Sequence, residues 1–285
     1  MSGKFGVALV GRNDNYGGQF AESLKYVLNS CLLTYDEVNF VDWNTPLDRP
    51  LLLDLIRPEL FETGKLRYII VRPELHHKLT DHFPYAEECS EVLGRNVGVR
   101  RLNTEYKICT NADEIQPPRE YLEQHADPKI FTTVARHGVQ MSDVKALGGP
   151  KDIESIRTQF AREGHNQAFP IRMSEDDCWS VVAWCGDLQM AHSDVWEEIQ
   201  GYDETALGSS YADTYIQRKA MEMGYQVVAA YDVPIFHIDH HKSSELNSAK
   251  AANPTDVLYN WYPKYTKPEV STWGLPQYNL EEIII

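Results

Sequence analysis

Three polar side chains are expected at the end of one short strand. Residues 106–110 are expected to form a strand that carries Ile108 into the core, and Asn111, Asp113 and Glu114 follow shortly after it. Open α/β sheets bind their ligands at the carboxyl ends of the strands. Carboxylate and amide oxygens there suit a hard divalent cation that is shared with substrate phosphates. The sequence therefore predicts a cation site at this strand end.

A second set of polar residues lies further along the chain. Asp213 begins a helix expected to run to about Met223, where the helix dipole would stabilise its ionised form and leave it ready to accept a proton. Capping of that helix is the alternative role. His237, His240 and His241 follow the last expected strand. Clustered histidines can bind zinc, but their spacing here differs from that of a His-Glu-x-x-His helix.

The elements that would position these residues alternate in the first half of the chain. Apolar runs at 5–10, 38–41 and 68–71 predict strands. The spacing of apolar residues from 20 to 31 predicts a helix, and another is expected at 51–61. Strands separated by helices imply βαβ units and a largely parallel sheet. Later elements are expected at 179–184, 193–199 and 226–231.

Composition narrows the class of protein. The chain has 285 residues, of which 42% are hydrophobic, enough for an ordinary packed core. No apolar run approaches the roughly 20 residues needed to span a bilayer, and the sequence starts without an apolar signal region. We therefore expect a soluble cytoplasmic protein. The five scattered cysteines have no Cys-x-x-Cys spacing, which indicates reduced residues in the core.

The net charge of -15 argues against nucleic-acid binding, because a phosphate backbone needs a basic surface. The same charge would repel a nucleoside diphosphate unless the binding site is locally positive. A divalent cation would supply part of that charge. The arginines that could supply the rest are Arg12, Arg95, Arg100 and Arg101.

The loop after the first strand reads Gly11-Arg12-Asn13. Together with Gly17 and Gly18 it does not form Gly-x-Gly-x-x-Gly, which disfavours a dinucleotide-dependent dehydrogenase. A tight turn without a ligand is the alternative role for these glycines.

Several segments, in the right order, resemble the family 2 glycosyltransferases of the GT-A fold. In that family a helix reading Arg/Lys-Asn-x-Gly-Ile/Val-Arg precedes a strand that ends in an Asp-x-Asp metal motif. Here the helix pattern lies at 95–100 and the motif reads Asn111-Ala112-Asp113, with an amide at the first carboxylate position. The resemblance implies that Asp113 binds the metal and that other residues of these motifs contact the nucleotide. Those residues are Arg95, Asn96, Arg100, Asn111 and Ala112.

The resemblance also concerns the nucleotide base. Gly11, Arg12 and Asn13 match the first nucleotide-contacting loop, and Asp42 matches the carboxylate that accepts a hydrogen bond from the base. A carboxylate there is satisfied by the N3–H of uracil and repelled by the N1 acceptor of adenine. UDP is therefore the preferred nucleotide, and helix capping is the alternative role of Asp42.

A later segment, 184–204, looks like the part of the family fold that borders the donor sugar and the acceptor. It makes Trp184, Gly186 and Asp187 candidate sugar contacts. An aromatic face beside a carboxylate suits a sugar, because the C–H face packs on the ring while hydroxyls donate to the acid.

The resemblance extends to the segments around the second polar set. Asp213 stands at the position of the catalytic base of inverting members, although Ala212 replaces the glutamate that precedes it. His237 matches a histidine that acts as the second metal ligand, with His240 as the alternative.

Together these features predict a GT-A domain over 1–240, with a mixed, mostly parallel central sheet flanked by helices. Residues 1–115 form the nucleotide-binding half, and 116–240 the acceptor-binding half, whose turn-rich part from 125 to 177 is an insertion packed on the sheet. Residues 241–285 are expected to be a tail that wraps the domain or contacts another copy in a homo-oligomer.

The expected activity is transfer of a sugar from a nucleotide sugar, preferably a UDP-sugar, to a carbohydrate or other hydroxyl acceptor. The expected cofactor is Mn2+ or Mg2+, and the expected outcome is inversion. Two alternatives are open. The first is an inactive nucleotide-sugar-binding protein of this fold, because Asn111 and Ala212 replace acids of the family motifs. The second is a nucleotidyltransferase, which would need a more basic loop than the one after the first strand.

Overall fold

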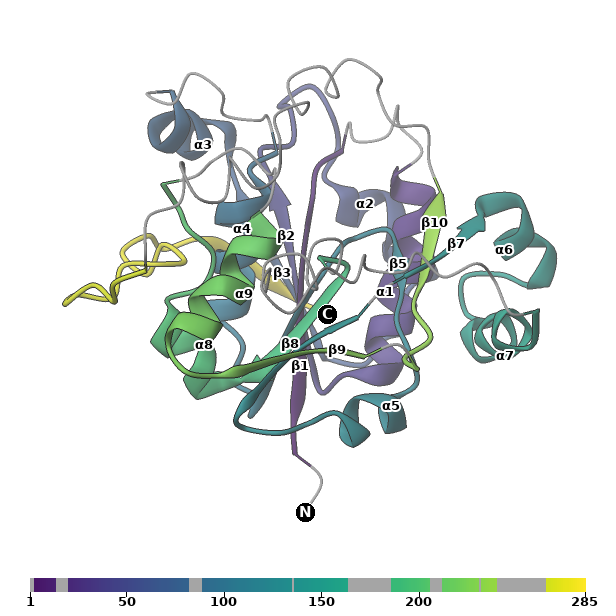
Figure 1. Cartoon of the computed structure of the whole chain (residues 1–285). Coiled ribbons are helices and arrows are strands. Elements are labelled where there is room, and N and C mark those ends of the chain that lie inside the picture. Colours follow the sequence, from purple (N-terminus) through teal and green to yellow (C-terminus); the bar gives the residue numbers. More distant parts are fainter. Residues whose placement is uncertain are drawn as a thin grey trace, which may run out of the picture.

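A computed structural model of the chain describes residues 3–13, 20–81, 89–134, 136–163, 186–205, 212–230, 232–239 and 265–285. In these residues an eight-stranded sheet of order β11-β3-β2-β1-β4-β8-β6-β9 runs through the centre, with helices on both faces (Figure 1). Its strands are β1 (Phe5–Gly11), β2 (Glu37–Trp43), β3 (Leu66–Val71), β4 (Tyr106–Thr110), β6 (Ile130–Val134), β8 (Leu188–His192), β9 (Gln226–Ala230) and β11 (Glu281–Ile284).

The sheet is mixed but mostly parallel. β1 pairs in parallel with β2 and β4, and β2 does so with β3. β8 is antiparallel to both β4 and β6, whereas β9 is parallel to β6. The carboxyl ends of β1, β2 and β4 therefore meet at one edge, which is where ligands bind in folds of this class. The predicted fold class is confirmed.

Helices cover the sheet because its strands alternate apolar side chains between two faces. Phe5, Val7 and Leu9 pack with α1, whereas Ala8 and Val10 pack with α4. The helices are α1 (Phe20–Thr34), α2 (Leu52–Ile56), α3 (Pro73–Thr80), α4 (Glu91–Arg100), α5 (Arg119–Gln124), α6 (Met141–Leu147), α7 (Ile153–Glu163), α8 (Ser193–Ile199) and α9 (Ala212–Glu222), with a 3-10 turn η2 (Arg57–Glu59) after α2. None of the described helices is long and apolar enough to cross a lipid bilayer.

Two glycines let α4 lie close against β1. A Cβ atom at Gly94 would come within 2.3 Å of Val10, and one at Gly98 within 2.8 Å of the Cβ of Ala8. Any larger side chain at either position would push the helix away from the strand. The close packing fixes where α4 carries Arg95, next to the end of β4.

A second, three-stranded sheet lies beside the carboxyl edge of the large one. Its order is β5-β10-β7, with β5 at Glu114–Ile115, β10 at Phe236–Asp239 and β7 at His137–Gln140. β10 is antiparallel to β5, so that His237 lies opposite Glu114. This pairing brings β10 next to the residues that follow β4.

The described C-terminal segment, 265–285, packs on the domain. Trp273 is buried, and Arg101 donates hydrogen bonds to the carbonyl oxygens of Gly274 and Leu275 at 2.7 and 3.3 Å. β11 then adds an antiparallel edge strand to β3. The described part of the segment thus packs on the domain and contributes a strand that was not predicted, and the expected tail over 241–285 stays a prediction.

Other elements also differ from the sequence-based expectations. The helix expected at 51–61 ends earlier, as α2 followed by a 3-10 turn, because Pro58 cannot donate the next helical hydrogen bond. Helix α3 was not predicted. β6 lies within the region expected to be an insertion, but it is a strand of the central sheet.

Candidate functional site

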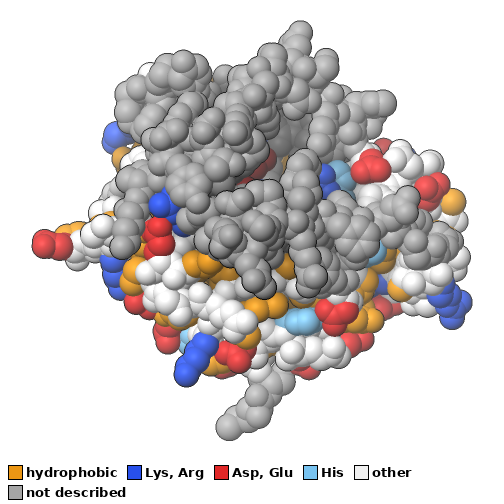
Figure 2. Space-filling view, in the orientation of Figure 1, with side chains coloured by type: hydrophobic (Ala, Val, Ile, Leu, Met, Phe, Trp, Pro, Cys, Tyr) orange, Lys and Arg blue, Asp and Glu red, His pale blue; other side chains and the backbone are white. Residues whose placement is uncertain are grey.

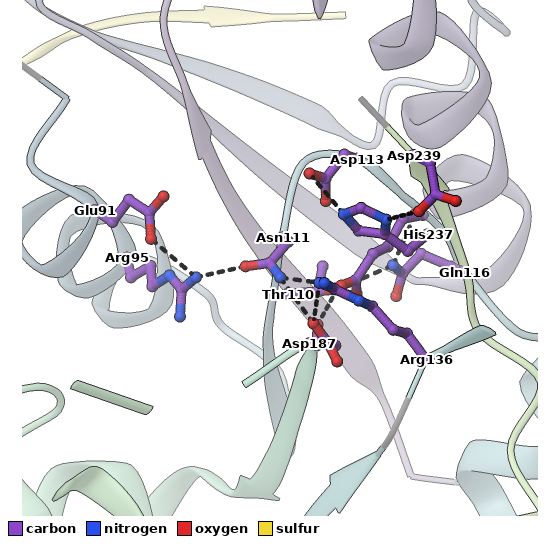
Figure 3. Close-up of polar contacts among 11 residues, drawn as sticks. Glu91, Arg95, Thr110, Asn111, Asp113, Gln116, Arg136, Asp187, His237 and Asp239 are labelled. Carbon is purple, nitrogen blue, oxygen red and sulfur yellow. Dashed lines mark hydrogen bonds and ion pairs between the residues drawn. The ribbon is translucent and has the colours of Figure 1, made fainter. Parts of the chain in front are cut away.

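Asp113 and His237 lie side by side at the carboxyl edge of the sheet (Figure 3). Asp113 directly precedes β5, and the amide of Ile238 in β10 donates to the carbonyl oxygen of Asp113 at 2.8 Å. Nε2 of His237 lies 3.2 Å from Oδ2 of Asp113, and both side chains are almost fully buried. The two residues predicted to bind a metal are therefore in contact, although they are far apart in the sequence.

The two side chains contact each other directly, at a spacing that two ligands of one divalent cation would also have. Ligands about 2.1 Å from an octahedral Mg2+ and at right angles to each other are about 3.0 Å apart. The 3.2 Å between Nε2 and Oδ2 is close to that spacing. Among the described residues, no group of three or more His, Cys, Asp or Glu side chains is arranged to hold a metal ion. A two-residue site suits an ion that keeps water ligands and binds substrate phosphates.

Asn111 links three neighbouring side chains of the site (Figure 3). Its Oδ1 accepts a hydrogen bond from Nη2 of Arg95 at 2.5 Å. Its Nδ2 lies 3.0 Å from Oε1 of Glu114 and 3.1 Å from Oδ1 of Asp187. An aspartate here would present a third carboxylate to these two acids, whereas the amide donates to both. These contacts explain why position 111 carries an amide and not a carboxylate.

Glu114 is fully buried between other acids. Burial raises its pKa well above the ordinary value, and the charges of Asp187 and Asp113 raise it further, while Arg136 opposes the shift. Arg136 holds Asp187 through an ion pair of 2.8 Å between Nη1 and Oδ1.

Asp213 faces the backbone of Gly186. A Cβ atom at position 186 would lie 2.3 Å from Oδ2 of Asp213, so only glycine fits beside this carboxylate. Burial raises the pKa of Asp213, although the Arg95 charge and the Thr214 amide oppose the shift. The net direction is opposite to the dipole effect expected from the sequence, because desolvation of the carboxylate is the largest contribution. A raised pKa suits a group that must accept a proton near neutral pH.

The carboxylate of Asp42 accepts hydrogen bonds from other residues of the protein. It is almost fully buried, and it accepts hydrogen bonds from the hydroxyls of Thr45 and Tyr68 and from the amide of Leu52 at 3.2 Å. Leu52 is the first residue of α2, whose N-cap residue is Leu51, so the carboxylate accepts from an amide at the start of that helix. Contact with a nucleotide base stays a prediction for Asp42.

The first loop is also held by internal contacts. A Cβ atom at Gly11 would lie 2.4 Å from the ring of Phe20, which gives this glycine a packing role. The amide of Asn13 donates to the hydroxyl of Thr45 at 3.1 Å. Arg12 is buried directly after β1. Their predicted nucleotide contacts stay predictions.

Two residues of α4 face away from the Asp113 pair. Asn96 is fully buried, donates to the carbonyl oxygen of Tyr202 and to Glu204 at 2.9 Å each, and accepts from the Tyr202 amide at 2.7 Å. The Arg100 guanidinium stacks over the ring of Trp273 with a separation of 5.3 Å. The structure therefore joins these two side chains to a turn and to the C-terminal segment. Their predicted nucleotide contacts also stay predictions.

Three other predicted site residues are Ala112, Trp184 and His240. Ala112 is buried next to Asp113. Trp184 and His240 lie outside the described residues. A surface depression of about 540 Å3, lined by Arg57, Phe61, Lys151 and their neighbours, contains none of the predicted site residues.

The sequence reasoning missed Arg136, which follows β6. β6 was not predicted because Thr132 and Thr133, both buried, interrupt its apolar pattern. The run Ile130–Val134 is nevertheless rich in β-branched residues, which favour strands. That signal would have placed Arg136 at a strand end, next to the other site residues.

Comparisons with known proteins address the fold. No protein-family model matches the sequence. No curated protein matches it either. The structure is similar to a mannosyltransferase, PcManGT from Pyrobaculum calidifontis, solved in complex with GDP-Man and Mn2+, with a TM-score of 0.50 and 16% sequence identity. The match covers 88% of this chain and 60% of that one. The chain thus has a Rossmann-like glycosyltransferase fold, and membership of family 2 stays a prediction.

Proposed function

We propose that the protein is a glycosyltransferase that moves a sugar from a nucleoside-diphosphate sugar to an acceptor hydroxyl with the help of a divalent cation. The observation that carries the proposal is the contact between Asp113 and His237 at the carboxyl edge of the sheet. It brings an oxygen and a nitrogen ligand together on a glycosyltransferase fold, where a bound diphosphate would need positive charge. The similar mannosyltransferase was solved with a nucleotide sugar and Mn2+.

Asp113 and His237 would hold Mn2+ or Mg2+. When bound, such an ion stabilises the charge that develops on the departing nucleoside diphosphate. The net charge of -15 makes this contribution important, because the rest of the molecule repels the donor. On the described part of the face shown in Figure 2, acidic and basic side chains are interspersed.

Arg95 and Arg136 supply the other positive charges of the site. Arg95 contacts Asn111, and Arg136 contacts Asp187. Both guanidinium groups keep the acids around Asn111 from presenting a purely negative surface. We expect Asp187, held in place by Arg136, to accept hydrogen bonds from hydroxyls of the donor sugar.

Asp213 is the proposed base. Its carboxylate would accept the proton of the acceptor hydroxyl while that oxygen attacks the anomeric carbon from the face opposite the diphosphate. The sugar is then transferred with inversion. A positioned base typically contributes a factor of 10² to 10⁴ in rate.

Two nucleotides are candidates for the donor. The preference for UDP rests on Asp42, whose carboxylate already accepts hydrogen bonds from Thr45, Tyr68 and Leu52. The similar mannosyltransferase was solved with a guanosine nucleotide sugar. Both nucleotides therefore belong in the test.

The test measures the thermal unfolding temperature with UDP, GDP, UDP-glucose and GDP-mannose, each with and without Mn2+. A ligand that binds only the folded protein raises this temperature in proportion to the logarithm of its saturation. We expect at least one compound to raise it, and only when Mn2+ is present. No shift with any of these compounds at millimolar concentration would contradict the proposal.

The inactive binding protein is the second candidate, and one observation favours it. Asn111 replaces an acid of the family motif, and its side chain is fully engaged with Arg95, Glu114 and Asp187. Slow hydrolysis of the bound nucleotide sugar distinguishes the two functions. The enzyme would release free sugar in the presence of Mn2+, whereas an inactive binding protein would not.

A further inference from the structure

His237 lies between two carboxylates (Figure 3). Its Nε2 is 3.2 Å from Oδ2 of Asp113, and its Nδ1 is 3.1 Å from Oδ1 of Asp239. Both ring nitrogens therefore have an oxygen neighbour, and the imidazole plane is fixed from two sides. Asp113 is the proposed metal ligand, but Asp239 has no role in the function described above.

Asp239 is itself held by the neighbouring strand. Nε2 of Gln140 in β7 donates to Oδ2 of Asp239 at 2.8 Å. The two residues are direct partners in the parallel pairing of β10 with β7. Each oxygen of the Asp239 carboxylate thus has one partner, His237 on one side and Gln140 on the other.

The backbone beside Asp239 leaves space for this arrangement. Gly138 is the register partner of His237 in β7. A Cβ atom at position 138 would lie 3.2 Å from both carboxylate oxygens of Asp239, which is tighter than ordinary contact. A glycine there allows the carboxylate to lie against the strand and to reach the imidazole.

Asp239 differs from an ordinary surface acid because its partner, His237, is buried. Its own side chain is 45% exposed, but the side chain of His237 is only 6% exposed. Exposed ion pairs contribute little because both groups are solvated and mobile. Here the imidazole is buried, so the partners of its two ring nitrogens bear on which nitrogen carries the proton.

We propose that Asp239, braced by Gln140, is a positioning residue for the cation site. Histidines that bind metals commonly donate their second ring N–H to a carboxylate, which fixes the tautomer and the ring orientation. With the proton held on Nδ1 by Asp239, the lone pair of Nε2 points toward the position beside Asp113. The inference rests on the proposed function, because it assumes that His237 is a cation ligand.

The first experiment measures how much Mn2+ is needed to half-saturate binding of UDP or GDP, by calorimetry. Loss of an outer partner of a metal-binding histidine typically weakens metal binding 10- to 100-fold. We expect Asp239→Ala to raise the required Mn2+ concentration about 10-fold or more. Asp239→Asn keeps an oxygen acceptor for Nδ1–H, and it should recover most of the loss.

The matched control is Asp232→Ala. Asp232 lies shortly before β10 and contacts Nε2 of His125 at 2.9 Å, so the substitution removes the same charge and another aspartate–histidine contact. It should leave the Mn2+ requirement unchanged. Equal requirements for wild-type protein and Asp239→Ala would overturn the positioning role.

The second experiment is a 15N NMR spectrum of the imidazole of His237 in the complex with Mg2+ and the nucleotide, assigned by its loss in His237→Gln. The proton should be on Nδ1 in the wild type, and Asp239→Ala should change this signal while Asp232→Ala does not. A wild-type proton on Nε2 contradicts the positioning role.

The two levels of the proposal fail differently. If wild-type protein binds neither UDP nor GDP in a Mn2+-dependent way, the proposed function fails and the role of Asp239 fails with it. If the wild type binds and His237→Ala does not, but Asp239→Ala binds normally, only the positioning role fails.

Discussion

The carboxylate of Asp213 lies directly against the backbone of Gly186, so that a Cβ atom at position 186 would be 2.3 Å from Oδ2 and 2.7 Å from Cβ of Asp213. Two segments far apart in the sequence meet at this point: the residues before β8 and the first turn of α9. Gln189 in β8 strengthens the contact by donating to the carbonyl oxygen of Asp213 at 2.8 Å. The position of the proposed base is thus set by the backbone of β8 and its preceding turn.

Gly186→Ala should displace the Asp213 carboxylate and reduce sugar transfer by a factor of 10² or more, since a positioned base contributes about 10² to 10⁴. Steady-state kinetics with separate values of kcat and KM checks this. Gly149→Ala is the control, because a Cβ atom there has only an ordinary contact, 3.5 Å from Asp152. Equal kcat for the two variants would show that the contact does not matter.

Asp213→Asn should bind the nucleotide sugar like the wild type but lose transfer by a factor of about 10² to 10⁴. The amide has nearly the same shape as the carboxylate, yet it cannot accept the proton of the acceptor hydroxyl. Calorimetry of donor binding and product analysis by chromatography measure the two effects. Full transfer activity in this variant would exclude the base role and point to a retaining reaction.

The sequence alone predicted those parts of the fold whose apolar periodicity is regular. The strand at 106–110 and the helix at 193–199 have the bounds that were expected. β6 escaped prediction because Thr132 and Thr133 are buried polar residues, and β5 escaped because it has only two residues. Periodicity cannot detect a strand of that length.

The candidate site shows a similar division. The residue types at Asp113 and His237 pointed to a cation, but their contact depends on the pairing of β10 with β5, which no local pattern encodes. The role of Asp42 depends on its burial and on Tyr68, a residue of the neighbouring strand. Such contacts arise from topology, so the sequence left two roles open for Asp42.

Asp113→Ala should abolish the Mn2+-dependent part of nucleoside-diphosphate binding, because one of the two proposed protein ligands is removed. Wild-type protein with a chelator should bind UDP or GDP with the same affinity as the variant does without metal. Calorimetric titration of UDP and GDP with Mn2+ and with EDTA checks both. An affinity in the variant that still rises with Mn2+ would contradict the role of Asp113.

Lys219 allows a prediction about pH and stability. Burial lowers its pKa to about 8, although Asp203 and Glu204 oppose the shift. Its Nζ donates to the carbonyl oxygen of Gly201 at 2.6 Å and lies 4.5 Å from the centre of the Tyr265 ring. The lysine therefore joins α9, which carries Asp213, to the turn after α8 and to the C-terminal segment.

The sign follows from the two pKa values. An unfolded chain keeps lysine protonated to about pH 10.4, whereas the folded protein releases the proton at about pH 8. Between these values the unfolded state binds more protons, so the free energy of unfolding contributed by Lys219 rises with pH. The slope is at most about 1.4 kcal/mol per pH unit.

Lys219→Met removes this titration and keeps a long apolar side chain. We expect the free energy of unfolding of the wild type to rise relative to that of the variant between about pH 8 and pH 10. Urea unfolding at several pH values measures the difference, in which titrations shared by both proteins cancel. A constant difference over this range would mean that the lysine is not desolvated in the folded protein, and a falling one would reverse the direction of its pKa shift.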